Sequence, residues 1–339
     1  MRPLVPEANV IQKDWRRVDL RVALCYPSTY RVGMAGLPVR LLYALFNRRE
    51  DVLCERFFLP GEGLDLPSPL SLESRRPLKD FDVVAFTFQY EWDYLNAVRM
   101  LLMAGIRPLR EERRGGPILL AGGPCVVDKP MPLADIVDVF AVGEAEVLLD
   151  PLVEGLKEVC GGGEGAMRDL ADVRGLYVPD VSEGAERTWV RSLDEAPVPL
   201  AQVIPLVEED SPLSSPFGRT FNLELVRGCG RGCRFCLIDH ITRPRRERSL
   251  EKALEILEEG LRLTPADKVL LIGAGISDYK RLLDVCEQMV SWGLRISVPS
   301  LRPEAVSEEL TRLLAEGGQR RLTIAPDGPT PRMREVINK

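Results

Sequence analysis

The sequence predicts an α/β protein of two domains, each built on a parallel β-sheet. Short apolar segments alternate with helix-forming segments from residue 21 to residue 158, and the same alternation resumes at residue 221. The intervening residues, 159–220, are rich in proline and glycine, which favours a connector. A chain of 339 residues also has room for about two domains.

The first domain, residues 21–158, is expected to contain five strands and three helices, after an irregular leader at residues 1–20. The run Asp82–Phe88 is continuously apolar, as expected for a central strand that is buried on both faces of a parallel sheet. Strands that alternate with helices favour this parallel arrangement. The expected strands are 21–26, 52–59, 82–88, 117–121 and 137–142, and the expected helices are 37–47, 92–104 and 144–158.

The connector, residues 159–220, is expected to form one β-hairpin. Its two arms, Gly175–Val178 and Thr188–Arg191, flank the turn-forming tripeptide Ser182-Glu183-Gly184. The proline-rich run Ala196–Pro216 excludes long helices and central strands from the rest of the connector.

The second domain, residues 221–339, is expected to contain four strand–helix units. Ser249 is predicted to be a helix N-cap, with Glu251 in the first turn of the helix that follows. A last helix opens at Arg332–Lys339 without a capping glycine. The expected strands are 222–226, 268–272, 295–298 and 321–325, and the other expected helices are 249–263, 279–292 and 303–315.

The composition is typical of a cytoplasmic globular protein. Lys and Arg number 45 against 51 Asp and Glu, and this net charge of −6 argues against a surface built for nucleic acid. No apolar run has the length of a signal peptide core or of a membrane span. Five cysteines have no framework spacing and are expected to be buried, reduced side chains: Cys25, Cys54, Cys125, Cys160 and Cys286.

Three further cysteines predict a metal centre. Cys229, Cys233 and Cys236 lie in one glycine-rich loop directly after a strand, so that tight backbone turns can gather their thiolates around a soft metal. A [4Fe–4S] cluster takes one cysteine per iron, so three cysteines would leave one iron open for a ligand. Structural zinc needs four ligands, and His240 leaves a Cys₃His zinc site as the alternative. Because structural zinc usually joins two separated ligand pairs, the single loop favours the cluster.

The motif Cys-x₃-Cys-x₂-Cys, followed by Arg243-Pro244-Arg245-Arg246 and a helix, resembles the radical S-adenosylmethionine (SAM) superfamily. Phe235 matches the aromatic residue that is usual before the third cysteine of that motif. The resemblance implies that the three cysteines hold a [4Fe–4S] cluster whose open iron binds the amino and carboxylate groups of SAM. It also implies reductive cleavage of SAM to a 5′-deoxyadenosyl radical, with the electron supplied by a flavodoxin- or ferredoxin-like donor.

The resemblance further implies SAM-binding positions at the ends of the later strands. Gly273, Ala274, Gly275 and Ser277 occupy the place of the segment whose backbone carbonyls meet the SAM amino group. Ser300 and Arg302 resemble positions that contact the ribose and the carboxylate. The other interpretation of each is an ordinary loop or capping residue.

The first domain resembles the cobalamin-binding domain, with a flavodoxin-like fold, that precedes many radical SAM barrels. In parallel sheets ligands bind at the carboxyl ends of the strands, and here those ends carry Thr87, Gly122, Gly123 and Gly143. Cobalamin domains that use a histidine carry Asp-x-His-x-x-Gly, where this chain has Ser28-Thr29-Tyr30-Arg31-Val32-Gly33. Cobalamin would therefore bind without a protein histidine, or the domain has kept the fold and lost the ligand.

The predicted function is that of a radical SAM enzyme which, if it binds cobalamin, methylates an unactivated carbon. One alternative is a methylthiotransferase of tRNA or protein, with Cys25, Cys54 and Cys125 as the thiols available for a second cluster. Another is a non-catalytic zinc-binding α/β module. The resemblance implies a partial barrel of six strand–helix units, so the C-terminal part is expected to be missing or to be supplied by a separate chain. The alternative is a smaller barrel whose sheet edge is covered by the connector, residues 159–220.

Overall fold

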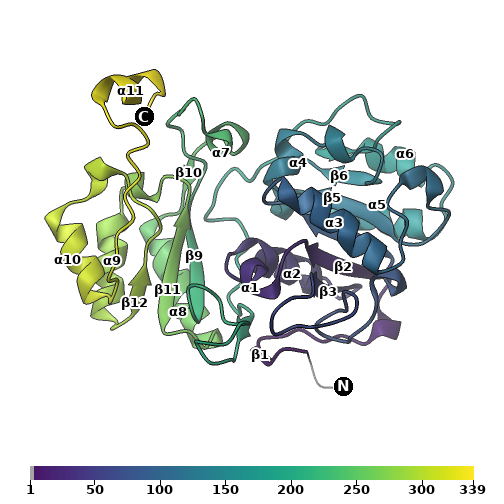
Figure 1. Ribbon diagram of the computed structural model, residues 1–339, viewed down its shortest axis with the longest axis horizontal. Helices are drawn as coiled ribbons and strands as arrows, with labels where there is room; N and C mark the ends of the chain where they lie inside the picture. The colour runs from purple at the N-terminus through teal and green to yellow at the C-terminus, as the bar shows by residue number, and fades with distance from the viewer. Residues whose placement is uncertain (1–3) are drawn as a thin grey trace. The chain divides into compact units, whose positions relative to one another are not determined.

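The computed structural model describes residues 4–339 and divides into two compact units, each with its own core (Figure 1). The first unit runs to Val190 and includes Pro205–Pro216. The second unit comprises Arg191–Ile204 and Phe217–Lys339. The segments expected to form the leader and the connector are thus distributed between these two units instead of lying outside them.

The first unit is a six-stranded sheet in the order β3-β2-β4-β5-β6-β7. The first five strands of this order are parallel, and β7 is antiparallel to β6. Numbered along the sheet, the parallel strands follow the 2-1-3-4-5 order of flavodoxin-like folds, which confirms the predicted fold class. The strands are β2 (Leu20–Tyr26), β3 (Val52–Phe58), β4 (Val83–Thr87), β5 (Ile118–Gly122), β6 (Val139–Ala141) and β7 (Leu176–Tyr177).

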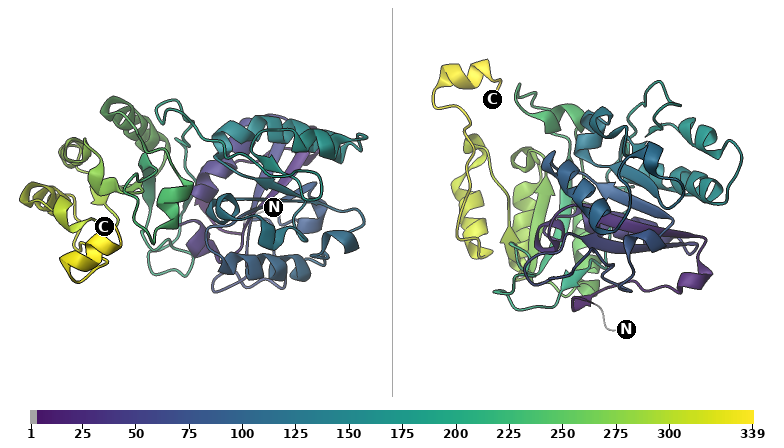
Figure 2. Two further views of the ribbon diagram at one scale, coloured as in Figure 1. Left: turned by 90° about the horizontal axis from the view of Figure 1, so that it is seen from above. Right: turned by 45° about the vertical axis from the view of Figure 1, so that its right-hand side comes forward.

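Helices cover both faces of this sheet, because successive strand residues point to opposite sides. Ala23 and Val84 pack in a cluster with Met100 of one set of helices, whereas Leu24 and Ala85 face the other set. Figure 2 shows α3 and α5 on opposite sides of the sheet. The helices are α2 (Pro38–Arg48) and α5 (Ala145–Cys160) on one face, and α3 (Trp92–Met103) and α4 (Pro124–Asp128) on the other, with α6 (Ala166–Ala171) packed on α5.

The expected β-hairpin in the connector is wrong. Its two arms do not pair with each other. The first arm pairs with β6, and the second arm pairs with the residues that directly follow β6. Tyr177 of β7 pairs antiparallel with Phe140, and Thr188 forms a parallel bridge with Gly143. The N–H of Glu144 donates to the carbonyl of Thr188 at 3.0 Å, so the second arm continues along the same edge.

The second unit has a four-stranded sheet in the order β10-β9-β11-β12, with β9, β11 and β12 parallel. Helices pack on one face, where Phe221 lies so close to Gly260 that a Cβ at Gly260 would be 2.3 Å from its ring. The elements are β9 (Thr220–Arg227), β10 (Arg246–Glu247), β11 (Lys268–Gly273), β12 (Arg295–Ser297), α8 (Leu250–Leu263), α9 (Leu282–Ser291) and α10 (Glu308–Glu316). Ser249 caps α8 by accepting from the N–H of Lys252, as predicted.

Side chains complete the edges of this sheet. The amide of Gln202 takes the place of a strand residue beside β9, since it accepts from the N–H of Asn222 at 2.9 Å and donates to its carbonyl at 2.8 Å. At the other edge, Gln319 accepts from the N–H of Val298 at 2.8 Å. Both amides satisfy backbone groups that would otherwise lack partners.

The expected fourth strand, residues 321–325, is wrong. This segment forms only one isolated parallel bridge, between Leu301 and Ile324. Gln319 already occupies the backbone groups of Val298, so the segment meets the chain after β12 and not β12 itself. The expected helix 303–315 is also shorter, because Ser307 caps α10.

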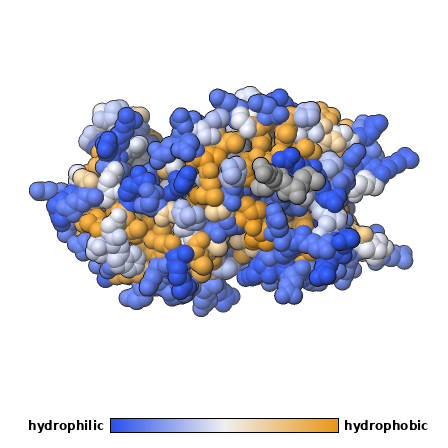
Figure 3. Space-filling model, turned by 90° about the horizontal axis from the view of Figure 1, so that it is seen from below, coloured by the Kyte–Doolittle hydropathy of each residue, from blue (hydrophilic) through white to orange (hydrophobic). Residues whose placement is uncertain are grey.

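The remaining elements are short. β1 (Glu7–Ala8) and β8 (Ile204–Pro205) form a two-stranded sheet, α1 (Tyr30–Gly33) follows β2, and α7 (Leu237–Ile241) and α11 (Pro331–Val336) lie in the second unit. Figure 3 shows hydrophobic patches among hydrophilic residues on one face of the molecule. Within residues 4–339, no helix is both long enough and apolar enough to span a membrane.

Candidate functional site

The three clustered cysteines lie between the end of β9 and α7. Cys233 is buried, and Cys229 and Cys236 are partly exposed. The loop begins at Gly228, whose φ is +79° and where a Cβ would lie 2.7 Å from the carbonyl oxygen of Pro244. Only glycine adopts this backbone without strain and leaves room for the returning chain. The loop is therefore held against the segment that leads back to the sheet.

The cysteine loop offers three thiols to a metal centre. Among residues 4–339, no three His, Cys, Asp or Glu side chains converge to bind one ion. A structural zinc ion takes four ligands, and a [4Fe–4S] cluster takes one cysteine sulfur per iron. His240, the candidate fourth zinc ligand, is exposed. The donor set is thus three thiols in one loop, as a cluster with one open iron requires.

The loop after β11 lies directly against the cysteine loop. At Gly275, φ is +66°, and a Cβ would lie 3.1 Å from Sγ of Cys229. Arg245 spans the two loops, since its Nη1 donates to the carbonyls of Cys229 at 3.3 Å and of Gly275 at 3.4 Å. The segment Gly273–Ser277, predicted to bind SAM, is therefore adjacent to the first predicted cluster ligand.

Two other predicted SAM residues meet near this loop. Ser277 Oγ accepts from the N–H of Arg302 at 3.0 Å, and the Arg302 guanidinium pairs with Glu304 at 2.6 Å. Ser300 is exposed between β12 and Arg302, and Ala274 is partly buried. Arg302 also lines a polar cavity of about 470 Å³ together with Arg231, Pro331, Arg334, Glu335, Asn338 and Lys339.

The ion pair between Arg231 and Asp278 joins two loops of this site and was not predicted from the sequence. Arg231, in the cysteine loop, donates from Nε to Asp278 at 2.8 Å. This hydrogen bond lowers the pKa of Asp278, although burial of the carboxylate acts in the opposite direction. The pair joins the cysteine loop to the end of the predicted SAM segment. No local sequence pattern identifies it, because the two residues are 47 positions apart.

The basic run after the cysteine loop braces the chain. Arg243 pairs with Asp239, and Arg245 binds Glu247 at 2.7 Å. Arg246 donates to the carbonyl of Pro244 at 2.9 Å, and Arg248 donates to the carbonyl of Glu224 at 3.0 Å. Each arginine therefore already has an acceptor within this chain.

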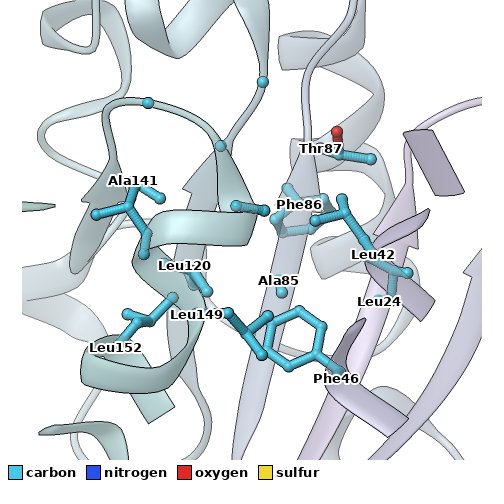
Figure 4. A pocket seen from close by; sticks show the side chains of 15 residues that line it. Leu24, Leu42, Phe46, Ala85, Phe86, Thr87, Leu120, Ala141, Leu149 and Leu152 are labelled. Carbon is cyan, nitrogen blue, oxygen red and sulfur yellow. The ribbon is translucent and has the colours of Figure 1, made fainter. Parts of the chain in front are cut away.

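In the first unit, the four residues predicted for cobalamin line one cavity of about 70 Å³ (Figure 4). The hydroxyl of Thr87 is the only polar side-chain group among the lining residues, and Gln89 donates to it at 2.9 Å. The cavity lies between the sheet and helices α2 and α5. Its lining residues are Leu24, Leu42, Phe46, Ala85, Phe86, Thr87, Leu120, Gly122, Gly123, Ala141, Gly143, Ala145, Leu148, Leu149 and Leu152.

Packing within the first unit explains two of these glycines. A Cβ at Gly123 would lie 2.5 Å from the carbonyl oxygen of Phe88, and a Cβ at Gly143 would lie 2.3 Å from Oγ1 of Thr188. The chain itself fills the space next to both glycines, so they do not make room for a ligand. Gly122 differs, since its nearest neighbour would be Cβ of Ala141 at 3.7 Å.

Tyr30 stands where histidine-using cobalamin domains carry their ligand. Its side chain is 1% exposed, and its hydroxyl donates to Oε1 of Glu7 at 2.8 Å. Burial is the main cause that raises the pKa of this hydroxyl well above its usual value. Tyr30 is therefore a structural residue of the first unit.

The thiols considered for a second cluster are dispersed. Cys25 and Cys54 are at most 1% exposed, on different strands, and burial raises the pKa of both thiols well above the usual range. Burial also raises the pKa of Cys125, in α4, to about 11. Neutral, separated thiols of this kind are typical of packed side chains and not of metal ligands.

Two sequence families match the chain. Residues 38–179 match the N-terminal region of radical SAM proteins, and residues 223–339 match the radical SAM superfamily. The chain belongs to the radical SAM superfamily, whose members bind a [4Fe–4S] cluster and SAM.

The chain is similar to an uncharacterised protein of Methanocaldococcus jannaschii, with 32% identity over 319 residues, or 94% of this chain and 63% of that protein. It also shares its fold with TsrM, a radical SAM methyltransferase of Kitasatospora setae, at a TM-score of 0.59 and 16% identity. One TsrM structure contains tryptophan and a SAM analogue, and another contains cobalamin and a [4Fe–4S] cluster. The match covers 93% of this chain and 60% and 62% of those two chains. The chain thus spans less than two thirds of the length of these relatives.

Proposed function

We propose that this chain carries the SAM-cleaving centre of a radical SAM enzyme, with Cys229, Cys233 and Cys236 as the three cluster ligands. The observation that carries this proposal is the position of Gly275. Its Cα faces Sγ of Cys229 so closely that any side chain would crowd the thiol. This contact supports a SAM site at the end of β11, next to the loop that would hold the cluster.

The residues around the loop have distinct roles in this proposal. The backbone of Gly273–Ser277 presents carbonyls for the amino group of SAM, and Arg245 fixes this segment against Cys229. Arg302 lies near Ser277, and its guanidinium binds the carboxylate of SAM after it has released Glu304. When bound, the cluster supplies the electron that cleaves SAM. A flavodoxin- or ferredoxin-like protein is the donor in this proposal.

The first unit is proposed to bind cobalamin, and the reaction to be methylation of an unactivated carbon. The flavodoxin-like strand order and the apolar cavity at the strand ends support the binding, and the fold shared with TsrM supports the reaction. The lining of leucine, phenylalanine and alanine is apolar, but the volume of about 70 Å³ is below the roughly 300–1,000 Å³ of ligand pockets, so cobalamin would have to widen this cavity or bind largely outside it. Because Tyr30 is buried and bound to Glu7, no side chain at that position ligates cobalt.

Anaerobic purification followed by metal analysis tests the proposal. The expected result is a brown protein with about four irons and one cobalt per chain after reconstitution. Cys233→Ala should remove the chromophore and the reductive cleavage of SAM, whereas His240→Ala, at an exposed position, should keep both. A zinc-loaded, colourless protein that loses its metal on His240→Ala would contradict the proposal.

A further inference from the structure

Asp239 connects two parts of the cysteine loop. It lies in α7, three residues after Cys236, and is 1% exposed. Its Oδ1 accepts from the N–H of Gly230 at 2.5 Å, and its Oδ2 accepts from the N–H of Gly232 at 3.0 Å. One carboxylate therefore ties the segment between the first two cysteines to the helix after the third.

The backbone of the loop is shaped for this carboxylate. Gly230 and Gly232 have φ values of +77° and +70°, which residues with a side chain rarely adopt. This conformation turns two N–H groups toward the same acceptor, where hydrogen bonds to an ionised group are stronger than neutral ones. Without Asp239, both N–H groups would need other partners inside a tight loop.

Asp239 is ionised at neutral pH. Burial raises its pKa, but hydrogen bonds from Arg243, Gly230 and Gly232 lower it by more, so that the pKa lies below the usual value. Arg243 lies one helical turn later and is half exposed, so it offsets only part of the negative charge.

This arrangement affects a cluster in the loop in two ways. The N–H groups of Gly230 and Gly232 are bound to a carboxylate and are not available to a cluster sulfide. Net charge and hydrogen bonds to the sulfurs set the reduction potential of iron–sulfur clusters. A nearby negative charge disfavours the addition of an electron, and so does the loss of N–H donors. Both effects act in the direction that favours electron transfer out of the cluster.

We propose that Asp239 is a positioning residue that fixes the cysteine loop and keeps the reduction potential of its [4Fe–4S] cluster low. The inference rests on the proposed function, because it needs a cluster at Cys229, Cys233 and Cys236. It adds that a residue of this chain, and not only the type of cluster, sets the reduction potential.

The test compares reconstituted wild-type protein with three variants by iron content and by a spectroscopic redox titration. Asp239→Asn keeps the shape, removes the charge and leaves one oxygen to accept from the two glycine N–H groups. Arg243→Gln removes the opposite charge. Asp267→Asn is the matched control, because Asp267 is an exposed carboxylate paired with Arg295 at the amino end of β11. We expect Asp239→Asn to shift the reduction equilibrium at least tenfold toward the reduced cluster, or about 59 mV for one electron. Arg243→Gln should shift it in the opposite direction, and Asp267→Asn should leave it unchanged.

The outcomes separate the two proposals. If wild-type protein holds the cluster but Asp239→Asn and Asp267→Asn have equal potentials, Asp239 has no tuning role. If Asp239→Asn binds no iron, the reduction potential of Arg243→Gln tests the inference instead. An unchanged potential in Arg243→Gln overturns the inference, and a lower potential supports it. If wild-type protein binds no iron under these conditions, the proposed function fails together with the inference.

Discussion

The contact between Gly275 and Cys229 gives the sharpest test of the SAM-cleaving site. Gly275→Ala places a Cβ 3.1 Å from Sγ of Cys229 and 3.4 Å from Nη1 of Arg245. The same substitution forces alanine into a left-handed conformation, at φ +66°. Gly293 provides a matched control, because its φ is +70° and no heavy atom lies within 4 Å of the position that a Cβ would take.

The two substitutions should lower the free energy of unfolding by similar amounts. Left-handed backbone costs a residue with a side chain about 1–2 kcal/mol. The reduced entropy of the unfolded chain returns about 0.4–1 kcal/mol when glycine becomes alanine. Each variant should therefore lose on the order of 1 kcal/mol, or less, by backbone conformation alone. Only Gly275→Ala must also move the thiol or the arginine by a few tenths of an ångström.

Urea unfolding, iron content and reductive SAM cleavage measure these effects separately. We expect similar unfolding midpoints for the two variants, but at least a tenfold lower rate of SAM cleavage for Gly275→Ala. The rate should fall because a small misplacement of a reacting group is enough to reduce catalysis strongly. If Gly275→Ala cleaves SAM as fast as Gly293→Ala, the loop after β11 does not bind SAM beside Cys229.

Three further predictions concern stability and cofactor state. Gly260→Ala should lower the free energy of unfolding by about 1–3 kcal/mol in urea, because its Cβ would overlap the ring of Phe221, whereas Gly184→Ala, in open space, should be neutral. Asp51→Asn should lower the free energy of unfolding by about 1 kcal/mol at pH 7. A hydrogen bond from Arg49 lowers the pKa of Asp51, so this stability is present above the unfolded carboxyl pKa of about 3.9 and declines as the pH falls below it. Cobalamin retained by the first unit, which contains no histidine, should show a base-off visible spectrum without an imidazole ligand. A base-on spectrum would contradict this prediction, because it would mean that the cofactor's own base has not been displaced.

Patterns within one segment predicted most elements of the fold. The apolar run Asp82–Phe88 indicated the central strand β4, and Ser249 indicated the start of α8, because burial on both faces and N-capping leave local signals. The cysteine loop was equally visible, since all its thiols lie within eight residues of the sequence, Cys229–Cys236.

The errors arose where a distant residue decides the structure. The two arms of the expected hairpin bind the edge beside β6, and no pattern between residues 175 and 191 specifies that edge. The expected strand 321–325 bridges only to Leu301, after β12, because the side chain of Gln319 occupies the backbone groups of Val298. Asp239 was not predicted either, because an aspartate in a short helix has no feature that identifies two glycine N–H groups as its partners.

Glycines at strand ends supported both cofactor predictions from sequence, but their surroundings in the two units differ. At Gly275 the nearest atom to an added Cβ is the thiol of Cys229, so the glycine is explained by the predicted cluster site. At Gly123 and Gly143 the nearest atoms belong to Phe88 and Thr188, so packing of the first unit explains both residues without cobalamin. Cobalamin binding therefore rests on the apolar cavity and on the strand order, and SAM cleavage rests on a contact between two loops. Since the two units have separate cores, iron and cobalt contents test the two predictions independently.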